Sequence, residues 1–574
     1  MVPFVDLLRS YRTIDGTRGP GAAQGSSPWW LPLSWERPRE FFAALWTQAE
    51  SALGGPAKSQ PEVGIDFYAD LVTRHLHRSS KSAAVRWHEP AEGWQSLTLW
   101  QLDEQARALA SILVGKGLQP GEHLALVLPS GASMVVGIMA ALSVGSVAIP
   151  VLPLGRTYVQ RLLADSKAKQ VVTCSPYTAL HGLLDYQPLV LSKALLAQAG
   201  AGPPSVTYAP DAPALLVRSP LRAPDSLLAV TAADSYCSAL RDGLLLFGLR
   251  PGERLATPAT PQYAPATYLA ALLCGAGLTE LSAEAVRMDA SPLYGASLRA
   301  VVLTQAIQDS LSEVGGGPVG WGGWFRDPQE GFDVANWERA DERLRLSAIP
   351  HANLLWDAAS GGAVMVSELR RGPPQPYMAP APGCAYLLGA LYGDGPTVTD
   401  VGRLLLLRKD GLPQGSPGEA LLLRTDHGYM YGGTALPRRA GWSYPSQDVQ
   451  TVLTQSLELS TLVGATVVEL GGGGRFGHSL FVVVLFTGSQ ATTHIDPKEC
   501  AALIERELGP GARPDRVEIV PLFPRRQGGT PGGAIDSDWV REQYVSSGLY
   551  QKAGSPLFRT LTKLRAALLQ RARG

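Results

Sequence analysis

The glycine run at residues 471–474, followed by Arg475, has the composition of a phosphate cradle. Glycines let backbone N–H groups approach phosphate oxygens, and an arginine adds positive charge. The run stands between two apolar strand patterns, whereas a phosphate-binding glycine loop normally leads into a helix. We therefore interpret it as a hairpin turn. The sequence also contains no Gly-x-Ser-x-Gly elbow, so a hydrolase triad has no anchor in it.

A close histidine pair and five cysteines are the candidates for metal binding or disulfide formation. His75 and His77 are the only close histidine pair, and helical metal-binding pairs usually stand about four residues apart. We interpret this pair as surface or packing residues. The cysteines are odd in number and contain no C-x-x-C spacing. This pattern favours reduced thiols in a cytoplasmic protein over a disulfide framework.

The composition is that of a large globular protein. The chain has 574 residues, of which 45% are hydrophobic, and its 50 basic and 50 acidic side chains give a formal net charge of zero. This apolar content excludes disorder throughout the chain. Zero net charge argues against a general binder of nucleic acid or of membrane surfaces, because both need a positive field.

Helix and strand patterns alternate from residue 65 onward. Apolar residues at helical spacing predict helices over 102–116 and 235–247. Each is followed by a Gly-Leu-x-Pro-Gly-Glu turn, a short strand and a second helix. Such βαβ units predict a mostly parallel sheet covered by helices. Because the unit occurs twice, we expect a large domain with two related α/β subdomains.

The later part of the chain changes character. Residues 403–424 are typical of a β-meander, with a hairpin turn at Asp410 and Gly411. After Trp442 the pattern becomes a compact α+β unit. The predicted organisation is an N-terminal arm over 1–62, a large domain over 63–440, a small C-terminal domain over 441–545 and a basic helical tail over 546–574.

Both ends of the chain allow two interpretations. We expect residues 1–62 to be an arm that packs on the body, with a partner-docking segment as the alternative. Residues 556–573 predict a basic amphipathic helix that docks on the body or binds a partner or membrane surface. No signal peptide is apparent, and the longest apolar stretch, 134–151, indicates a buried helix running into a strand. We expect a cytoplasmic protein without a transmembrane segment.

A longer run of the sequence is specific for one family. Segments 97–102, 106–113, 117–122, 124–129, 145–150 and 161–173 follow each other in a characteristic order, and Gly418 to Arg424 and Asp448 to Leu453 extend the match. In these segments the chain resembles the adenylate-forming (AMP-binding) superfamily, and within it the acyl-CoA synthetases, over residues 64–545. The resemblance implies an α/β fold. It has a large N-terminal domain of two α/β subdomains plus a small β-barrel, followed by a small α+β C-terminal lid domain.

The phosphate loop of this family reads S-G-T-T-G-x-P-K-G and leads to a threonine. Its glycines and hydroxyls surround the ATP phosphates and its lysine supplies charge. The matching segment here, Ser219 to Thr231, reads S-P-L-R-A-P-D-S-L-L-A-V-T. Ser226 stands at the lysine position, and Arg222 is the one cation that could partly compensate. The resemblance therefore implies a degenerate phosphate loop.

The second family motif, W-Q-T-E-T-G-G, uses its glutamate to hold the magnesium bound to ATP. It corresponds here to W-D-A-A-S-G-G at 356–362, with Ala359 at the glutamate position. Asp357 stands two positions early, so we expect it to point elsewhere. The substrate-pocket candidates are Trp356, Asp357, Ser360 and Gly361, with packing in the pocket wall as the alternative for Trp356.

Two further family sites are altered. The ribose-binding tract Y-x-T-G-D has no counterpart between Arg424 and Trp442, where Asp426 is the nearest acid. The catalytic lysine of P-x-T-x-x-G-K-I-x-R corresponds to Ala534. No lysine stands between Lys193 and Lys409 or between Lys498 and Lys552, so a small shift of the alignment cannot fill either lysine position. Arg525 and Arg526 are cationic, but arginine does not simply replace a lysine that reaches into a pocket.

The family's adenine loop corresponds to G-W-G-G-W-F at 320–325, where the bulky Trp324 would fill the nucleotide pocket. Four altered sites on a preserved scaffold predict a catalytically degenerate acyl-CoA synthetase-like protein with a binding or scaffold role. Adenylation depends mostly on electrostatic clamping of ATP, which these changes remove. We expect no catalytic residues and no metal site.

On this hypothesis ATP and magnesium do not bind. A CoA thioester or a small acyl group is the candidate ligand, and a protein or acyl carrier is the candidate partner, without nucleic acid. The first alternative is a divergent active ATP-dependent acyl-CoA ligase, in which Arg222, Asp357 and Arg525 or Arg526 stand in for the missing groups. The second is an enzyme that acts on acyl thioesters without ATP.

Overall fold

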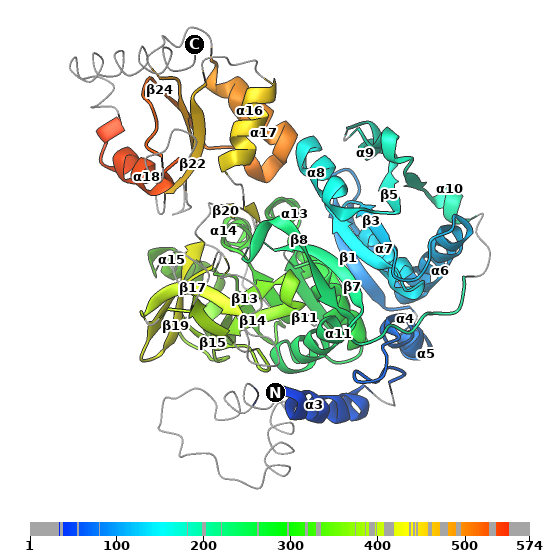
Figure 1. The fold of residues 1–574 in the computed structure, drawn as a ribbon. Coiled ribbons are helices and arrows are strands. Elements are labelled where there is room, and N and C mark those ends of the chain that lie inside the picture. The colour runs from blue at the N-terminus through cyan, green and yellow to red at the C-terminus, as the bar shows by residue number, and fades with distance from the viewer. Residues whose placement is uncertain are drawn as a thin grey trace. The chain divides into compact units, whose positions relative to one another are not determined.

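The structure is a computed structural model of the 574-residue chain (Figure 1). It describes residue 34 and residues 38–53, 57–79, 81–180, 182–197, 202–219, 221–260, 263–294, 298–315, 320–328, 334–373, 375–384, 386–389, 396–397, 399–406, 418, 420–434, 438–439, 442–443, 446–456, 462–470, 480–488, 495–526 and 535–549. The chain divides into two compact units. The larger is Met1–Pro153 with Gln160–Ala435, and the smaller is Leu154–Val159 with Leu436–Gly574.

A six-stranded sheet lies in the larger unit, with strand order β6-β5-β3-β4-β7-β8. Neighbouring strands pair in parallel except β7 and β8, which form an antiparallel hairpin. The bounds are β3 His123–Val127, β4 Val147–Val151, β5 Gln170–Cys174, β6 Leu189–Leu191, β7 Pro213–Ser219 and β8 Ala223–Thr231. β3 and β4 are almost entirely buried, as expected for parallel strands covered on both faces.

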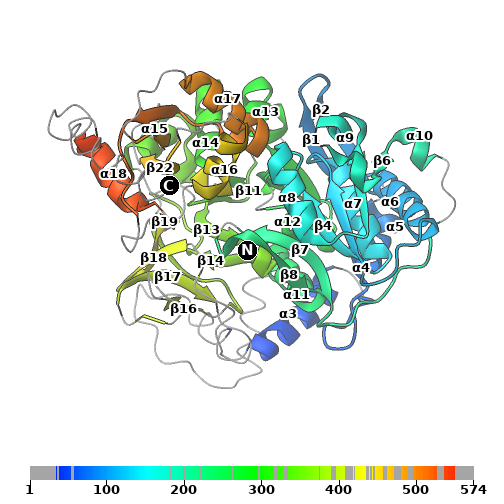
Figure 2. The same ribbon diagram turned by 45° about the horizontal axis from the view of Figure 1, so that its top comes forward.

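A thirteen-stranded sheet forms the rest of this unit, in the order β16-β17-β18-β19-β15-β14-β13-β12-β11-β9-β10-β1-β2. Its centre is parallel, from β13 through β1. These strands are β1 Ala83–Glu89, β9 Arg254–Pro258, β10 Gly277–Leu281, β11 Leu298–Leu303, β12 Trp324–Arg326 and β13 His351–Asp357. β2, Gly93–Thr98, is the antiparallel edge strand beside β1, and Figure 2 shows both in blue.

The other end of this sheet is antiparallel. It consists of β14 Gly362–Val366, β15 Tyr377–Pro380, β16 Tyr386–Gly389, β17 Val401–Leu406, β18 Ala420–Thr425 and β19 Gly428–Thr434. β17 and β18 are the antiparallel strands predicted for 403–424, while the predicted turn at Asp410 and Gly411 lies outside the described residues. The strands continue the hydrogen-bonded ladder from β13 without a break.

Helices connect and cover these strands. The larger unit contains α3 Pro38–Ala52, α4 Phe67–Leu71, α5 Leu76–Ser79, α6 Leu99–Gly115, α7 Ala132–Ser143, α9 Ser175–Leu180, α10 Lys193–Leu196, α11 Ala232–Arg241, α12 Ala266–Leu273, α13 Ala283–Met288, α14 Gln305–Val314 and α15 Val334–Leu344. α8, Arg156–Ser166, contains residues of both units. In the part of the chain that the structure describes, no helix is long and apolar enough to span a membrane. The apolar stretch at 134–151 is α7 running into β4, as predicted.

The predicted repeat is confirmed. α6, a turn, β3 and α7 form the first copy, and α11, a turn, β9 and α12 form the second. In each turn the glutamate carboxylate accepts the N–H of the residue three positions earlier. Glu122 Oε2 lies 2.9 Å from Gln119 N, and Glu253 Oε2 lies 2.9 Å from Arg250 N. The repeated sequence therefore encodes the same closed turn twice.

The second copy departs from the predicted single helix over 235–247. α11 ends at Arg241 and continues as a π-helical turn over Asp242–Leu246. Such a wide turn costs hydrogen-bond geometry and usually has a local reason. Gly243 lies directly on α12 here, since a Cβ at this position would be 2.7 Å from the Ala270 carbonyl oxygen. The periodicity of apolar residues in the sequence does not predict this contact between Gly243 and α12.

The described part of the N-terminal arm packs on the body. α3 lies against α11 and buries Phe41, Leu45 and Leu53 to 2% exposure or less. The Trp46 ring lies 5.4 Å from that of Tyr236. Trp29, Trp30 and Trp35 are outside the described residues.

The smaller unit is an α+β fold of its own. Its sheet has the order β22-β23-β24, with β22 Gly464–Leu470, β23 Leu480–Phe486 and β24 Arg516–Val520. α16 Ser446–Ser456 and α17 Pro497–Leu508 share a hydrophobic core with this sheet, and α18 Ser537–Val545 contributes to a second core cluster. A two-stranded pair, β20 Arg438–Arg439 and β21 Trp442–Ser443, precedes it. The predicted turn at 471–474 and the tail 556–573 lie outside the described residues.

Candidate functional site

The segment that matches the phosphate loop forms the tip of the β7–β8 hairpin. Arg218 pairs with Leu227, whereas the next residue, Ser219, pairs with Ala223. Residues 224–226, including the lysine position Ser226, fall between these two pairs. The hairpin therefore closes over a short turn at 219–223 rather than opening into a wide glycine loop.

The Ser219 hydroxyl holds this turn together from inside. Ser219 is fully buried, and its Oγ accepts the backbone N–H groups of Leu221 at 3.2 Å and Arg222 at 3.1 Å. In a phosphate loop such N–H groups point at the ligand. Here both donate to a side chain of the loop itself.

Leu221 anchors the same turn in a hydrophobic core. Its side chain is 0% exposed and belongs to a cluster with Leu355, Met365, Leu404 and Ala420, from β13, β14, β17 and β18. Gly418 allows this approach, because a Cβ there would be 2.3 Å from the Leu221 carbonyl oxygen. The apolar residue at a position where the family has a hydroxyl thus fixes the turn to the antiparallel end of the sheet.

Asp357 connects the two altered motifs. It ends β13, is 0% exposed and caps the 3-10 turn Ala358–Ser360. Oδ1 accepts the Ser219 hydroxyl at 2.5 Å and the Ala359 N–H at 3.3 Å, and Oδ2 accepts the Ser360 hydroxyl at 2.6 Å. Both carboxylate oxygens therefore have protein donors.

Arg222 lies beside the lost glutamate position. Its guanidinium donates to the Ala359 carbonyl oxygen at 3.4 Å, while Ala359 itself is buried. Arg222 is only partly buried, so its charge lies at the surface of the site. The structure thus brings Ser219, Arg222, Asp357 and Ser360 together around Ala359.

The two glycines of this motif fit against α11. Gly361 has a φ of +74°, and a Cβ there would lie 3.1 Å from the Asp234 carbonyl oxygen. A Cβ at Gly362 would lie 1.9 Å from Asp242 Oδ2. Asp242 also accepts the Ala363 N–H at 2.9 Å. Close packing against α11 is therefore sufficient to explain why these two positions are glycines, and no ligand is needed for the explanation.

A buried ion pair beneath Gly362 has no signal in the sequence. Arg241 and Asp242 are 1% and 0% exposed, with Nε and Oδ1 2.7 Å apart. The guanidinium also donates to the carbonyl oxygens of Ala363 at 2.8 Å and Pro382 at 3.2 Å. The pair joins α11 to β14 and to the segment after β15. Adjacent Arg and Asp in a helix ordinarily face solvent, so the tertiary structure was needed to find it.

Trp356 is packed inside the unit. Its ring is 0% exposed and stacks on Phe247 at 5.9 Å and on Tyr263 at 5.6 Å between ring centroids. Tyr263 is also fully buried, and its hydroxyl donates to Asp327 Oδ2 at 2.5 Å. The described geometry corresponds to the packing alternative for Trp356.

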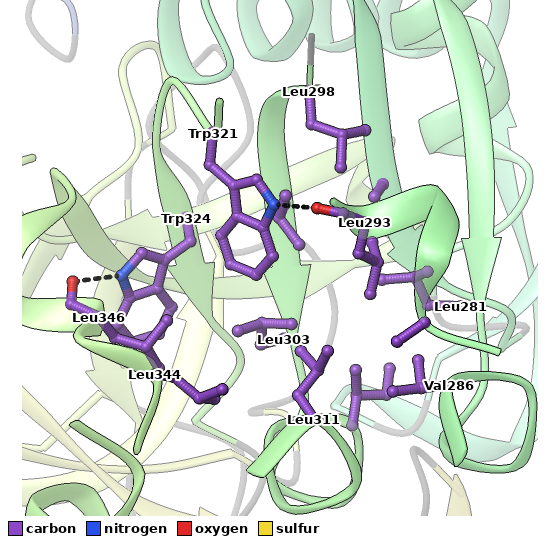
Figure 3. Close-up of a cluster of buried hydrophobic side chains, with 14 of the residues drawn as sticks. Leu281, Val286, Leu293, Leu298, Leu303, Leu311, Trp321, Trp324, Leu344 and Leu346 are labelled. Atoms are coloured by element: carbon purple, nitrogen blue, oxygen red, sulfur yellow. Dashed lines mark hydrogen bonds between the residues drawn. The ribbon is translucent and has the colours of Figure 1, made fainter. Parts of the chain in front are cut away.

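Trp324 does not lie where the sequence placed it. It is fully buried in a core cluster with Trp321, Trp337 and several leucines, and its Nε1 donates to the Leu346 carbonyl oxygen at 3.1 Å (Figure 3). The ring stacks on Trp337 at 5.3 Å. The neighbouring Phe325 packs against Phe247 instead, beside Trp356. Alternation along β12 therefore sends Trp324 into the core, which corrects the expectation of a filled nucleotide pocket.

The remaining predicted residues lie apart from this site. Thr231 ends β8 and caps α11 by accepting the Asp234 N–H at 3.1 Å. Asp426 is exposed in the two-residue turn between β18 and β19. Ala534 lies outside the described residues. In the smaller unit, Arg525 pairs with Asp536 at 3.3 Å and Arg526 donates to the Val463 carbonyl oxygen at 3.2 Å.

His75 has the packing role that was predicted. It is 3% exposed, and its Nε2 lies 3.3 Å from the Leu273 carbonyl oxygen. Among the described residues, no group of three or more His, Cys, Asp or Glu side chains could hold a metal ion. The five cysteines are free thiols.

The fold, with a large α/β unit and a smaller α+β unit, matches that of adenylate-forming enzymes. Residues 72–231 match the family described as AMP-binding enzyme. Over these residues the chain is similar to that family, and solved structures extend the likeness to the fold. The o-succinylbenzoate CoA synthetase of Bacillus subtilis has a similar structure, with a TM-score of 0.64 and 14% identity over 83% of this chain and 98% of that one. The Brucella canis acyl-CoA synthetase gives a TM-score of 0.54 and 16% identity over 88% and 97%.

Curated relatives match over shorter stretches. The salicyl-AMP ligase / salicyl-S-ArCP synthetase of Mycobacterium tuberculosis is 29% identical over 31% of this chain and 39% of its own length. Tyrocidine synthase 3 of Brevibacillus parabrevis is 39% identical over 17% of this chain and 1% of its own length. The chain therefore covers well under two thirds of these relatives.

Proposed function

We propose that this protein is a catalytically degenerate acyl-CoA synthetase-like protein that binds an acyl ligand or a protein partner instead of adenylating an acid. The bond between the Ser219 hydroxyl and the Asp357 carboxylate carries the proposal. In this hydrogen bond, a donor from the segment that resembles one ATP-binding motif is paired with an acceptor from the segment that resembles another. The N–H donors of the turn are also bound within the protein, to Ser219 Oγ.

Opening this arrangement for ATP would be costly. The triphosphate would have to break hydrogen bonds to a buried carboxylate, and a charged hydrogen bond contributes about 1.5–3 kcal/mol. It would also approach Asp357, a buried acid that repels phosphate. Leu221 adds an apolar anchor that would have to leave its core. These costs support an ATP site that is closed.

The ligand class follows from the relatives. They include a salicyl-AMP ligase / salicyl-S-ArCP synthetase, an o-succinylbenzoate CoA synthetase and an anthranilate CoA ligase. We propose that this chain retains affinity for an acyl-CoA thioester or an acylated carrier protein. Such a role needs the scaffold and the acyl or partner surface, and it does not need the phosphate clamp.

Thermal unfolding with and without millimolar Mg-ATP tests the proposal, alongside ATP–pyrophosphate exchange with a panel of carboxylic acids. A ligand at 100 times its Kd adds about 2.7 kcal/mol of stability. We expect no shift and no exchange with Mg-ATP, and a shift with at least one acyl-CoA. An active acyl-CoA ligase serves as the positive control. Acyl-adenylate formation by this chain would overturn the proposal.

A divergent active ligase is the second candidate, and the position of Arg222 favours it. The guanidinium donates to the Ala359 carbonyl oxygen at 3.4 Å, so a cation lies beside the residue that corresponds to the family's glutamate. If this chain is a ligase, Arg222→Ala should lower the rate of adenylation on the order of 10²–10³-fold. The exposed Arg287→Ala should not change it. Unchanged activity in Arg222→Ala would exclude this version of the ligase.

A further inference from the structure

A cavity of about 260 Å³ lies in the larger unit, away from the Ser219–Asp357 site. It opens at the N-terminal ends of β9 and β10, which begin at Arg254 and Gly277. Asp357 is the last residue of β13, which runs parallel to these strands through β12 and β11. The cavity and Asp357 therefore lie at opposite ends of the parallel strands of this sheet.

The lining of the cavity carries an excess of positive charge. Its cationic side chains are Lys81, Arg86 and Arg254, and its one acid is Glu253. The carboxylate of Glu253 accepts the Arg250 N–H and closes its own turn. Within the described part of the chain, neither Arg86 nor Arg254 forms an ion pair with a carboxylate.

Small and polar residues line the cavity together with the two arginines. Gly277 is the partner of Arg254 on β10 and has no side chain, and a Cβ there would lie 2.3 Å from the Ala83 carbonyl oxygen. Ala84 lines the cavity beyond it. On the edge strand, Ser96 stands directly opposite Arg86, and Thr98 also lines the cavity. Two arginines and two hydroxyl-bearing residues therefore line one cavity.

The two arginines disfavour each other's charge. Burial and the positive charge of Arg86 lower the pKa of Arg254 to about 10, and burial lowers the pKa of Arg86. At neutral pH both groups remain charged, so the folded protein holds two cations close together without compensation. A bound anion would remove this repulsion.

The first copy of the helix–turn–strand repeat has different residues at the positions of Arg254 and Gly277. The position of Arg254 is occupied there by His123, whose Nδ1 lies 2.7 Å from the Ser166 carbonyl oxygen. The position of Gly277 is occupied by Val147, which is fully buried. The shared turn therefore does not require an arginine or a glycine at these two positions.

We propose that the cavity between Arg86, Arg254 and Ser96 binds a phosphate group, as a compact tetrahedral dianion. Guanidinium groups form paired hydrogen bonds with phosphate oxygens, and the hydroxyl groups of Ser96 and Thr98 add donors. Lys81 is exposed at the rim and attracts the anion from solvent. This site is independent of the proposed function.

Titration with inorganic phosphate, followed by calorimetry and by thermal unfolding at constant ionic strength, tests the site. We expect saturable binding to the full chain, similar binding of sulfate and much weaker binding of acetate. Phosphate esters then distinguish an organic phosphate from the free ion, because an ester that binds more tightly has contacts beyond the phosphate group. Arg86→Gln with Arg254→Gln should weaken phosphate binding at least about tenfold. Arg287→Gln, which removes an exposed arginine, is the matched control and should bind like the parent protein.

The variant Ser96→Glu separates a loss of phosphate binding from a loss of stability. Ser96 is exposed, and a carboxylate opposite Arg86 would form a cross-strand ion pair without disturbing the core. We expect this variant to unfold at the same or a higher temperature and to lose phosphate binding. Phosphate binding that persists in Ser96→Glu and in the double arginine variant would overturn the proposal, as would the absence of binding to the parent protein.

Discussion

Ser219 Oγ lies 2.5 Å from Asp357 Oδ1, across 138 residues of sequence. The bond joins the tip of the β7–β8 hairpin to the end of β13 and is fully buried. Each residue belongs to a segment that resembles a different ATP-binding motif. Their mutual contact is therefore the observation on which the proposed function rests.

Replacing Asp357 by Ala should destabilise the larger unit by about 3 kcal/mol, because the buried hydroxyl of Ser219 and the half-buried hydroxyl of Ser360 lose their acceptor. Urea unfolding measures the effect. A double-mutant cycle with Ser219→Ala should give a coupling of about 0.5–3 kcal/mol. Asp426→Ala, in an exposed turn, is the control and should change stability by less than about 0.5 kcal/mol. Strict additivity of the two buried changes would contradict the contact.

Leu221→Ala should cost about 2–5 kcal/mol, since it leaves a cavity in the cluster that fixes the hairpin tip. The same change at Leu423, which is 38% exposed on β18, should cost much less. Thermal unfolding of both variants gives the comparison. Equal losses at the two positions would show that Leu221 is not an anchor.

Gly362→Ala should destabilise the protein strongly, because the added Cβ would lie 1.9 Å from Asp242 Oδ2 and push apart the Arg241–Asp242 pair. Breaking a buried pair typically costs about 3–5 kcal/mol. Gly115→Ala, at the end of α6 with open space around it, is the matched control. It should stabilise the protein by up to about 1 kcal/mol. A tolerated alanine at 362 would mean that α11 and β14 can separate.

Glu280 should make stability depend on pH. It is buried beside Tyr268, whose hydroxyl donates to its carboxylate, and burial raises the pKa of Glu280 from 4.5 to about 7. Because the folded state holds the proton more tightly than the unfolded state, this contribution to stability is complete below pH 4.5. It is lost as the pH rises through 7, and the difference is about 3 kcal/mol.

Glu280→Gln removes the titrating group and keeps its shape. We expect the free energy of unfolding of this variant to vary less between pH 5 and pH 8 than that of the parent protein, with a gain in stability at pH 8. Urea unfolding across this range is the measurement. Parallel pH profiles for the two proteins would contradict a raised pKa.

Much of the fold followed from local patterns. The repeated Gly-Leu-x-Pro-Gly-Glu turns predicted both α/β copies, because caps, glycine turns and periodic apolar faces act within a few residues. The altered motif positions, such as Ala359, could also be seen in the sequence. The orientation of Trp324 could not, because a three-residue strand between two sheet neighbours has too little pattern to assign its faces.

The sequence by itself predicted the α/β class, the repeated helix–turn–strand–helix unit and the resemblance to adenylate-forming enzymes. The tertiary structure alone decided that Ser219 and Asp357 satisfy each other, that Arg241 and Asp242 form a buried pair, and that Arg86 and Arg254 face one cavity. The physical reason is the range of the forces. Helix and turn formation depends on neighbours in the chain, whereas hydrogen bonds, ion pairs and charge repulsion in the interior depend on residues that only folding brings together.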